Sequence, residues 1–369
     1  MPPISVLIKP ASGGCNMLCD YCFYCDEARK RERAFYGLMT EQTLKNVIRK
    51  TMLYAEGQIS YVFQGGEPTL CGLEFYEKVL MYQKQYNKHG IRVQNAIQTN
   101  GYALDEAWCR FFRENQFLVG VSVDGTKEIH DTYRHSKTGK PTFDRILQSI
   151  SLLEQYQVDY NILTVVTKQA AARIADIYEF YKEKGWRYQQ YILCLEPFAE
   201  GYEKQNYALT PEEYGSFLSN LFDLWYADWK EGKQPYIRQF ENYVGMLAGY
   251  QPESCDMRGK CSIQHVVEAD GSVYPCDFYV LDEYYLGNLN EQRMPEIAEA
   301  GRRSGFAERA LLVEESCKTC SYFKLCRGGC YRTRVESEYS KSYYCEGYRM
   351  FFEHCLEPLR EIAESISKR

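Results

Sequence analysis

Strand and helix patterns alternate through the first 230 residues, and this alternation limits the possible folds more than any other feature. Short segments rich in β-branched and aromatic residues predict six strands. These are Ser5–Lys9, Ile59–Phe63, Arg92–Gln98, Leu118–Val123, Tyr160–Val166 and Arg187–Leu195. Helical stretches separate or follow them at Glu41–Tyr54, Glu74–Asn87, Asp105–Glu114, Thr142–Tyr156, Ala171–Lys184 and Pro211–Trp229. Strands joined through helices form parallel sheets with right-handed crossovers.

Six such units are fewer than the eight of a closed α/β barrel. We therefore expect an α/β fold with a partial (β/α)6 barrel of the TIM type or an open sheet, and in either case ligands at the C-terminal ends of the strands. Near residue 235 helical periodicity fades and Cys becomes frequent. This change predicts two domains, residues 1–234 and residues 235–369, the second closed by an amphipathic helix over Glu346–Ser367.

Composition and charge exclude several classes of protein. Lys and Arg total 44 against 50 Asp and Glu, a net charge of −6, which argues against a nucleic-acid partner. No apolar run approaches the roughly 20 residues of a membrane span, and no secretory signal is visible. We expect a cytoplasmic protein without a membrane partner, whose 16 Cys serve metal or redox chemistry rather than disulfides.

Three cysteines, Cys15, Cys19 and Cys22, follow the first predicted strand in the segment CNMLCDYC. Thiolates at this spacing can converge on one metal centre. A 4Fe-4S cluster usually takes four Cys, so three would leave one iron free for another molecule. Cys25 could supply a fourth ligand, and a tetrahedral zinc loop is then the alternative.

The Cys-x3-Cys-x-aromatic-Cys pattern resembles the signature of the radical SAM superfamily, and the segment YVFQGGEP resembles its GGEP motif. The resemblance implies a 4Fe-4S cluster whose free iron binds S-adenosylmethionine, which is cleaved to a 5′-deoxyadenosyl radical. The residues that it implies as contacts of this cofactor are Tyr21, Gly66, Ser122, Arg134 and Leu195. The GxIxGxxG-like stretch of many members is not evident after the fifth predicted strand.

A second set of cysteines resembles the SPASM extension of radical SAM enzymes. Its spacing is Cys261-x9-Gly271-x4-Cys276, then Cys317-x2-Cys320-x5-Cys326-x3-Cys330, then Cys345, with Cys255 as an eighth thiol. Eight thiolates are enough for two fully ligated auxiliary 4Fe-4S clusters. The family pattern implies Cys255, Cys261, Cys276 and Cys330 for one cluster and Cys317, Cys320, Cys326 and Cys345 for the other. Spacing alone leaves two alternatives open, a pair of structural zinc sites and Cys355 in place of Cys345.

Within the SPASM group, the segments CNMLCDYCFY, FQGGEPTL and YPCDFY most resemble the anaerobic sulfatase-maturating enzymes. This resemblance implies oxidation of a Cys or Ser, in a Cys/Ser-x-Pro-x-Arg motif of an unfolded or nascent sulfatase, to Cα-formylglycine. The deoxyadenosyl radical would remove a Cβ hydrogen, a base would take a proton, and an electron would pass to an auxiliary cluster. An electron donor such as flavodoxin or ferredoxin is the further partner implied.

Asp277 directly follows Cys276, and the resemblance assigns it the role of the base. A carboxylate in a low-dielectric site can have a raised pKa suited to proton uptake. The alternative is a carboxylate that binds the amides of its own loop. The candidate contacts of a peptide substrate are Tyr24, Gln64, Gln98 and Asn100, since amides can bond a peptide backbone from both ends.

Three other functions fit parts of the sequence. One is another SPASM peptide-modifying radical enzyme, such as a thioether-forming maturase. The others, a non-catalytic iron–sulfur electron carrier and a zinc-stabilised binding module, leave the GGEP motif and the three-Cys loop unexplained. Of the remaining cysteines, Cys25, Cys71, Cys109, Cys194 and Cys355, we expect most in the core.

Overall fold

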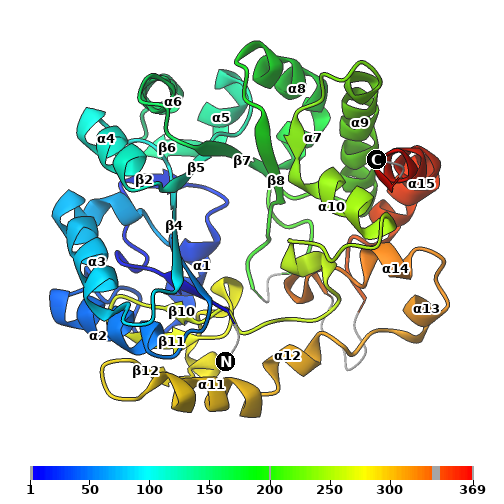
Figure 1. Ribbon diagram of the computed structural model, residues 1–369. Coiled ribbons are helices and arrows are strands. Elements are labelled where there is room, and N and C mark those ends of the chain that lie inside the picture. The colour runs from blue at the N-terminus through cyan, green and yellow to red at the C-terminus, as the bar shows by residue number, and fades with distance from the viewer. Residues whose placement is uncertain (1–2, 199–200, 335–340, 368–369) are drawn as a thin grey trace. The chain divides into compact units, whose positions relative to one another are not determined.

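The structure is a computed structural model that describes residues 3–198, 201–334 and 341–367 (Figure 1). The chain divides into two compact units. The first comprises Met1–Ser122, Asp131–Tyr160 and Ser262–Phe306, and the second comprises Val123–His130, Asn161–Cys261 and Ala307–Arg369. Among the described residues, no helix combines the length and apolar character that crossing a membrane requires.

The first unit is built on a sheet with the strand order β12-β11-β10-β1-β3-β4-β5. Its first four strands along the chain are parallel: β1 (Ile4–Ile8), β3 (Gln58–Phe63), β4 (Arg92–Thr99) and β5 (Leu118–Ser122). Each matches a predicted strand to within one residue at either end. Side chains alternate in burial along β3, where Ile59, Tyr61 and Phe63 are buried. The pleat therefore explains why this strand could be read from the sequence.

A hairpin from much later in the chain extends this sheet beside β1. Strand β10 (Val266–Val267) is parallel to β1, and β11 (Ser272–Tyr274) and β12 (Gly287–Asn288) follow in antiparallel order. The short helix η3 (Asp277–Tyr279) comes next after β11, so Cys276 and Asp277 belong to the same unit as the N-terminal Cys loop. Strands of two or three residues have no detectable period, and none was predicted here.

The helices of the first unit bury one face each. In α2 (Glu41–Met52), Leu44, Val47 and Ile48 are buried at helical spacing, and Thr40 caps the helix by accepting a hydrogen bond from Thr43 N (3.1 Å). Figure 1 shows α2, α3 and α4 together on one side of β4. The other helices are α1 (Phe23–Lys30), α3 (Leu73–Tyr86), α4 (Glu106–Glu114), α6 (Phe143–Gln155), α11 (Met294–Arg303), η1 (Pro68–Cys71) and η4 (Asp282–Tyr284). A small antiparallel sheet pairs β2 (Met17–Cys19) with β6 (Arg134–Ser136).

The second unit contains the parallel strands β7 (Tyr160–Val166), β8 (Tyr188–Leu193) and β9 (Tyr236–Ile237). The single helix predicted over 171–184 is wrong. It is two helices, α7 (Lys168–Ala172) and α8 (Ile174–Glu183), because Thr167 caps an earlier start and Arg173 leaves the helical conformation. The Cys-rich part of this unit contains four short helices, η2 (Cys255–Met257), α13 (Glu315–Lys318), α14 (Phe323–Cys326) and η5 (Tyr331–Thr333). Two further helices, α5 (Lys127–Tyr133) and α12 (Phe306–Arg309), have residues in both units.

The C-terminal helix α15 (Cys345–Ser367) confirms the predicted closing helix and packs against α9 (Pro211–Lys230). Their backbones meet at two glycines. A Cβ added to Gly347 would lie 2.3 Å from Pro211 O, and one added to Gly215 would lie 2.9 Å from Gly347 Cα. Helix α10 (Arg238–Leu247) also packs on α15, with the rings of Phe240 and Phe351 stacked at 6.1 Å.

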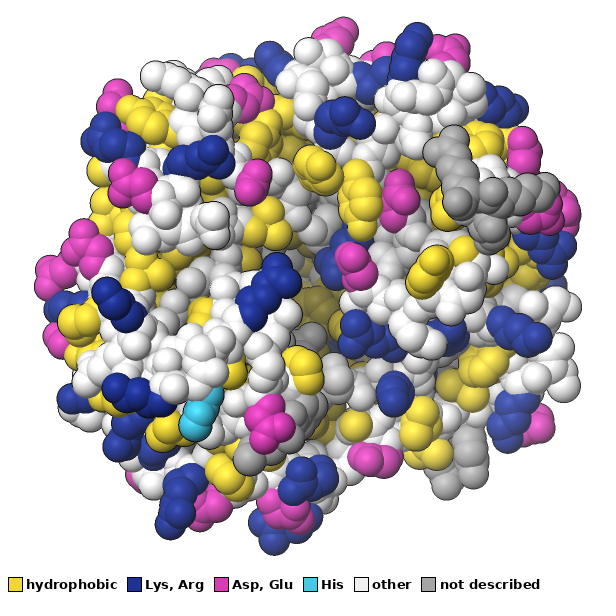
Figure 2. Space-filling view, in the orientation of Figure 1, with side chains coloured by type: hydrophobic (Ala, Val, Ile, Leu, Met, Phe, Trp, Pro, Cys, Tyr) yellow, Lys and Arg dark blue, Asp and Glu magenta, His cyan; other side chains and the backbone are white. Residues whose placement is uncertain are grey.

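Charges of both signs are interspersed on the face that Figure 2 draws. Lys and Arg side chains lie between Asp and Glu side chains, so neither sign covers that face.

The cap of α9 gives a test of local stability. Thr210 Oγ1 accepts from Glu213 N (3.1 Å) and Thr210 N donates to Glu213 Oε2 (3.0 Å), a capping box. We expect Thr210→Ala to cost about 1 kcal/mol of unfolding free energy, measured as a lower urea midpoint under anaerobic conditions. Ser216→Ala, at an exposed position inside the same helix, is the control and should leave the midpoint unchanged or higher.

Candidate active site

The three N-terminal cysteines lie in the segment between β1 and α1, called here the Cys loop: Cys15 precedes the short strand β2, Cys19 ends it, and Cys22 precedes α1. Cys22 N donates to Cys19 O (3.1 Å), and Met17 N donates to Cys15 Sγ (3.3 Å). Burial raises the pKa of Cys15 to about 12, and the charges of Glu67, Cys19 and Cys22 also raise it. The charges of the two neighbouring thiols thus disfavour the Cys15 thiolate, and a cationic iron cluster, which binds thiolates, would offset this.

The turn after β3 lies directly on this Cys loop. Gly65 and Gly66 both have positive φ, 86° and 51°. A Cβ on Gly66 would lie 2.1 Å from Gly14 O, and Glu67 N donates to the same oxygen (2.8 Å). Glycine is therefore required at position 66, where the absent side chain leaves backbone groups accessible beside the Cys loop.

Glu67 holds the turn, although the sequence predicts no role for it. Its buried carboxylate accepts hydrogen bonds from Thr69 N (3.0 Å), Thr69 Oγ1 (2.6 Å), Thr99 Oγ1 (2.8 Å) and Asn100 N (2.8 Å). These bonds join the ends of β3 and β4. The position of Glu67 within the GGEP motif is the signal that could have identified it.

Arg134 also belongs to the Cys loop. Pairing of β2 with β6 sets Arg134 opposite Cys19, and Arg134 Nη1 donates to Tyr21 Oη (2.9 Å). The structure thus brings two of the predicted cofactor contacts together beside a predicted ligand. Ser122 is half-buried as the last residue of β5, and Leu195 is half-buried just beyond β8 in the second unit.

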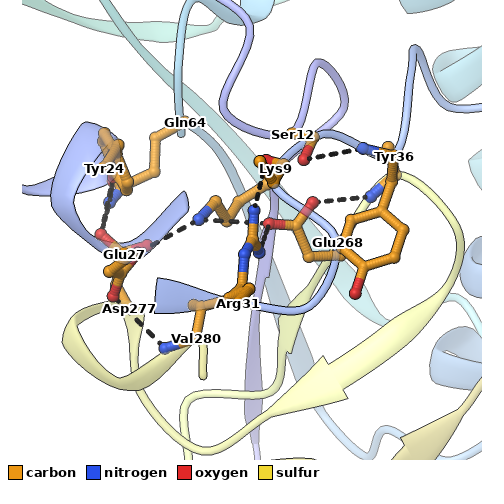
Figure 3. Close-up of polar contacts among 12 residues, drawn as sticks. Lys9, Ser12, Tyr24, Glu27, Arg31, Tyr36, Gln64, Glu268, Asp277 and Val280 are labelled. Atoms are coloured by element: carbon orange, nitrogen blue, oxygen red, sulfur yellow. Dashed lines mark hydrogen bonds and ion pairs between the residues drawn. The ribbon is translucent and has the colours of Figure 1, made fainter. Parts of the chain in front are cut away.

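The four predicted peptide contacts occupy different surroundings. Asn100 Nδ2 donates to Asn16 Oδ1 (2.7 Å) and lies 3.5 Å from Cys15 Sγ, so its amide supports the Cys loop. Gln98 is half-buried near the end of β4. Tyr24 and Gln64 both bind Asp277 (Figure 3).

The half-buried Tyr24 and Gln64 and the buried Asp277 form a triad from α1, the turn after β3 and η3. Tyr24 Oη donates to Asp277 Oδ2 (2.7 Å), Gln64 Nε2 donates to the same oxygen (2.6 Å), and Gln64 Nε2 lies 2.9 Å from Tyr24 Oη. Asp277 is 6% exposed, and burial raises its pKa above the ordinary value, opposed by Lys9. Among the described residues, its other oxygen, Oδ1, has no hydrogen-bond partner. The carboxylate thus has one oxygen held by two side chains and one that is buried without a hydrogen-bond partner among the described residues.

The cysteines of the second unit fall into two groups. Burial raises the pKa of Cys330 to about 12, and the cysteines whose charges raise it further are Cys255 and Cys261. Burial raises the pKa of Cys326 to about 11, and the other members of its group are Cys317, Cys320 and Cys345. The family pattern implies a ligand set that contains each of these groups, and it adds to the first Cys276, which belongs to the first unit; the ligand sets stay a prediction.

In the part of the chain that the structure describes, no disulfide bond joins any of the 16 cysteines. Cys109, Cys194 and Cys355 are buried as expected of core residues, whereas Cys25 and Cys71 are half-buried. Within the three described ranges, no group of three Cys, His, Asp or Glu side chains is arranged to hold a metal ion.

Comparison with known proteins identifies the family of the chain. Residues 10–181 match the Radical SAM superfamily, and residues 255–321 match SPASM, an iron–sulfur cluster-binding domain. Over 99% of its length the chain is 44% identical to the Cysteine-type anaerobic sulfatase-maturating enzyme of Clostridium perfringens strain 13, all of which it covers. The chain belongs to the anaerobic sulfatase-maturating enzymes. It is also 34% identical to the Serine-type enzyme of Bacteroides thetaiotaomicron, over 95% of this chain and 89% of that one.

Solved structures of anaerobic sulfatase-maturating enzymes share the fold. Native anSMEcpe with bound AdoMet and Cp18Cys peptide matches with a TM-score of 0.95 and 43% identity, over 99% of this chain and 100% of that one. Streptococcus suis SuiB bound to precursor peptide SuiA matches with a TM-score of 0.64 and 15% identity, over 93% of this chain and 76% of that one, which shows a common fold alone. The predicted fold, a partial barrel followed by a SPASM domain and a closing helix, is thereby confirmed.

The Gly66 turn generates a prediction for this sulfatase-maturating enzyme. We expect Gly66→Ala to lower S-adenosylmethionine cleavage by at least about 100-fold, because the new Cβ displaces the turn from Gly14 O. Deoxyadenosine release by the anaerobically reconstituted protein is the measurement. Gly245→Ala, in α10 with its nearest atom 3.9 Å away, is the control and should cleave at the normal rate. Normal cleavage by Gly66→Ala would contradict the requirement for glycine.

The two Cys groups predict the iron content of variants. Cys255→Ala and Cys317→Ala should each lose about one third of the bound iron, since each breaks one of three 4Fe-4S clusters. Combining Cys255→Ala with Cys261→Ala should remove no more, whereas combining Cys255→Ala with Cys317→Ala should remove about two thirds. Iron and sulfide analysis of anaerobically purified protein is the measurement. Equal losses in both double variants would contradict the grouping.

Proposed function

We propose that this enzyme oxidises the Cys of a Cys-x-Pro-x-Arg motif, in an unfolded or nascent sulfatase, to Cα-formylglycine. The observation that carries the proposal is the buried Asp277 Oδ1, which has no hydrogen-bond partner among the described residues. Tyr24 and Gln64 hold the other oxygen of this carboxylate, directly after the predicted cluster ligand Cys276. Two Cysteine-type relatives are 44% and 42% identical to the chain, whereas two Serine-type relatives are 34% and 32% identical. This difference favours Cys over Ser as the target.

The residues at the site fit S-adenosylmethionine and a 4Fe-4S cluster as cofactors. Cys15, Cys19 and Cys22 would hold the cluster, and the backbone exposed at Gly66 would receive the methionine group, with Tyr21 and Arg134 alongside. When bound, the reduced cluster and S-adenosylmethionine supply the radical that removes the Cβ hydrogen. The two other Cys groups would hold auxiliary clusters that receive the electron released when the target is oxidised.

In this proposal Asp277 takes the proton of the target thiol on Oδ1. Loss of that proton, the Cβ hydrogen and one electron leaves a thioaldehyde, which water hydrolyses to the aldehyde with release of sulfide. Tyr24 and Gln64 both donate to Oδ2, so they fix the direction in which Oδ1 points. Burial disfavours the carboxylate and makes it a stronger proton acceptor than an exposed Asp. The peptide contacts proposed for Tyr24, Gln64, Gln98 and Asn100 then lie at the ends of β3 and β4 and on α1.

An outside one-electron carrier of the flavodoxin or ferredoxin class completes the proposal, because each cleavage of S-adenosylmethionine consumes an electron. The enzyme would work in the reducing cytoplasm, where thiols stay available as cluster ligands. The proposed division at residues 234 and 235 separates the two matched segments, 10–181 and 255–321. It assigns radical formation to the first part and electron transfer to the second.

The first experiment tests the reaction itself. Anaerobically reconstituted protein, with reductant and S-adenosylmethionine, should convert a Cys-x-Pro-x-Arg peptide to the aldehyde, read by mass spectrometry. The matched Ser-x-Pro-x-Arg peptide should react at least about ten-fold more slowly, because its O–H is a poorer proton donor than a thiol. Deoxyadenosine release with both peptides unmodified would contradict the proposed function and favour another peptide substrate.

The base assignment has its own test. Asp277→Asn should lower formylglycine formation by at least about 100-fold, since the amide cannot accept the proton. Iron content should stay at the wild-type value. Asp282→Asn, on the exposed helix η4 of the same segment, is the control and should react normally. Full turnover by Asp277→Asn would exclude the base role, and loss of iron together with activity would favour a role in holding the loop.

A further inference from the structure

Four charged side chains are buried together next to the Tyr24 triad (Figure 3). They are Lys9, Glu27, Arg31 and Glu268, with 1%, 1%, 7% and 0% of their surface exposed. Lys9 Nζ lies 3.3 Å from Glu268 Oε1 and 3.6 Å from Glu27 Oε2, and Arg31 Nη1 lies 2.7 Å from Glu268 Oε1. None of these residues is a predicted site residue or a contact of the mechanism above.

Lys9 contacts two separate parts of the site. Its ammonium nitrogen lies 4.6 Å from the centre of the Tyr24 ring. Its stem packs on the turn after β3, because a Cβ built on Gly65 would lie 2.6 Å from Lys9 Cγ and 2.7 Å from Lys9 Cε. A single side chain at the end of β1 therefore touches both the turn that carries Gly66 and the phenol that binds Asp277.

The charge of Lys9 is fixed in place. Burial of an ammonium group is costly unless it is paired, and here Glu268 and Glu27 provide the pairing. Burial lowers the pKa of Lys9, but these carboxylates outweigh it and keep the pKa above the ordinary value. A charged ammonium that cannot move restrains the ring against which it lies, since the ring face attracts the cation.

We propose that Lys9 is a positioning residue. It holds Tyr24, and through Tyr24 also Asp277, at a fixed position relative to the Gly66 turn. The proposal rests on the proposed role of Asp277. Without Lys9 the Tyr24 ring loses its cation and the Gly65 turn loses the stem that packs on it. Radical formation then continues, but fewer radicals lead to product because the base is out of place.

Lys9→Met tests this role, because Met keeps an unbranched stem and removes the charge. We expect formylglycine formed per deoxyadenosine released to fall by at least about five-fold, with iron content unchanged and the peptide KM within about two-fold. A crystal structure of the variant should show Tyr24 Oη withdrawn from its 2.7 Å contact with Asp277 Oδ2. Lys78→Met is the control, since Lys78 pairs with Glu41 and Glu74 on the surface of α3, and its ratio should equal that of the wild type.

Two further variants keep the test decisive. If Lys9→Met does not fold, Lys9→Met with Glu27→Gln removes both charges and leaves the pair of Arg31 and Glu268 intact. This double variant should show the same lower ratio. Lys9→Met combined with Tyr24→Phe should lose little more than Tyr24→Phe alone, because residues that act through one contact are not additive.

An unchanged ratio in Lys9→Met, or losses that add fully with Tyr24→Phe, would overturn the proposal. Loss of iron in parallel with product, in both the single and the charge-balanced variant, would overturn it too, in favour of a structural role. A wild-type enzyme that makes no formylglycine would instead contradict the proposed function. The position of Tyr24 in the crystal structure of Lys9→Met would still decide the role of Lys9.

Discussion

Pairing of β1 with β10 is the interaction on which the site depends. The two strands are short and parallel, and the hydrogen bond from Lys9 N to Val267 O (2.8 Å) continues their ladder. Glu268 follows at once, so the buried ion pair with Lys9 extends the contact beyond the last strand residue. This strand pairing brings the segment that carries Asp277 to the loop after β1. Tyr24 and Asp277, which form a hydrogen bond there, are 253 residues apart in the sequence. Without the strand pairing, Asp277 would have no fixed relation to Tyr24.

The sequence predicts the parts of this structure that are local. The six parallel strands carry alternating or continuous apolar patterns, and each was placed within about two residues. The cysteine spacings are local as well, since Cys15, Cys19 and Cys22 share one loop. The GGEP motif marks a turn in which backbone contact excludes any side chain at Gly66. Patterns of this kind depend on neighbours in the chain, which a single sequence displays.

Contacts between distant segments could not be predicted in the same way. Tyr24 and Gln64 were expected to meet the peptide, and the structure shows them holding Asp277. The two-residue strands β10 and β12 carry no period, and the roles of Glu67 and Lys9 follow from three-dimensional packing. For Lys9 in particular, the sequence alone predicts an exposed side chain at the end of a strand, because Lys is rarely buried unless it is paired.

The glycine contact between α9 and α15 has a consequence for the order of assembly. Cys345 is the first residue of α15, so the last thiol of its group takes its place when this helix docks on α9. Domains fold from the N-terminus during synthesis, and α15 follows Cys317, Cys320 and Cys326 in the chain. This group of thiols therefore stays incomplete until α15 has been synthesised and has docked on α9. Its completion comes after synthesis of the parallel strands, all of which precede α15.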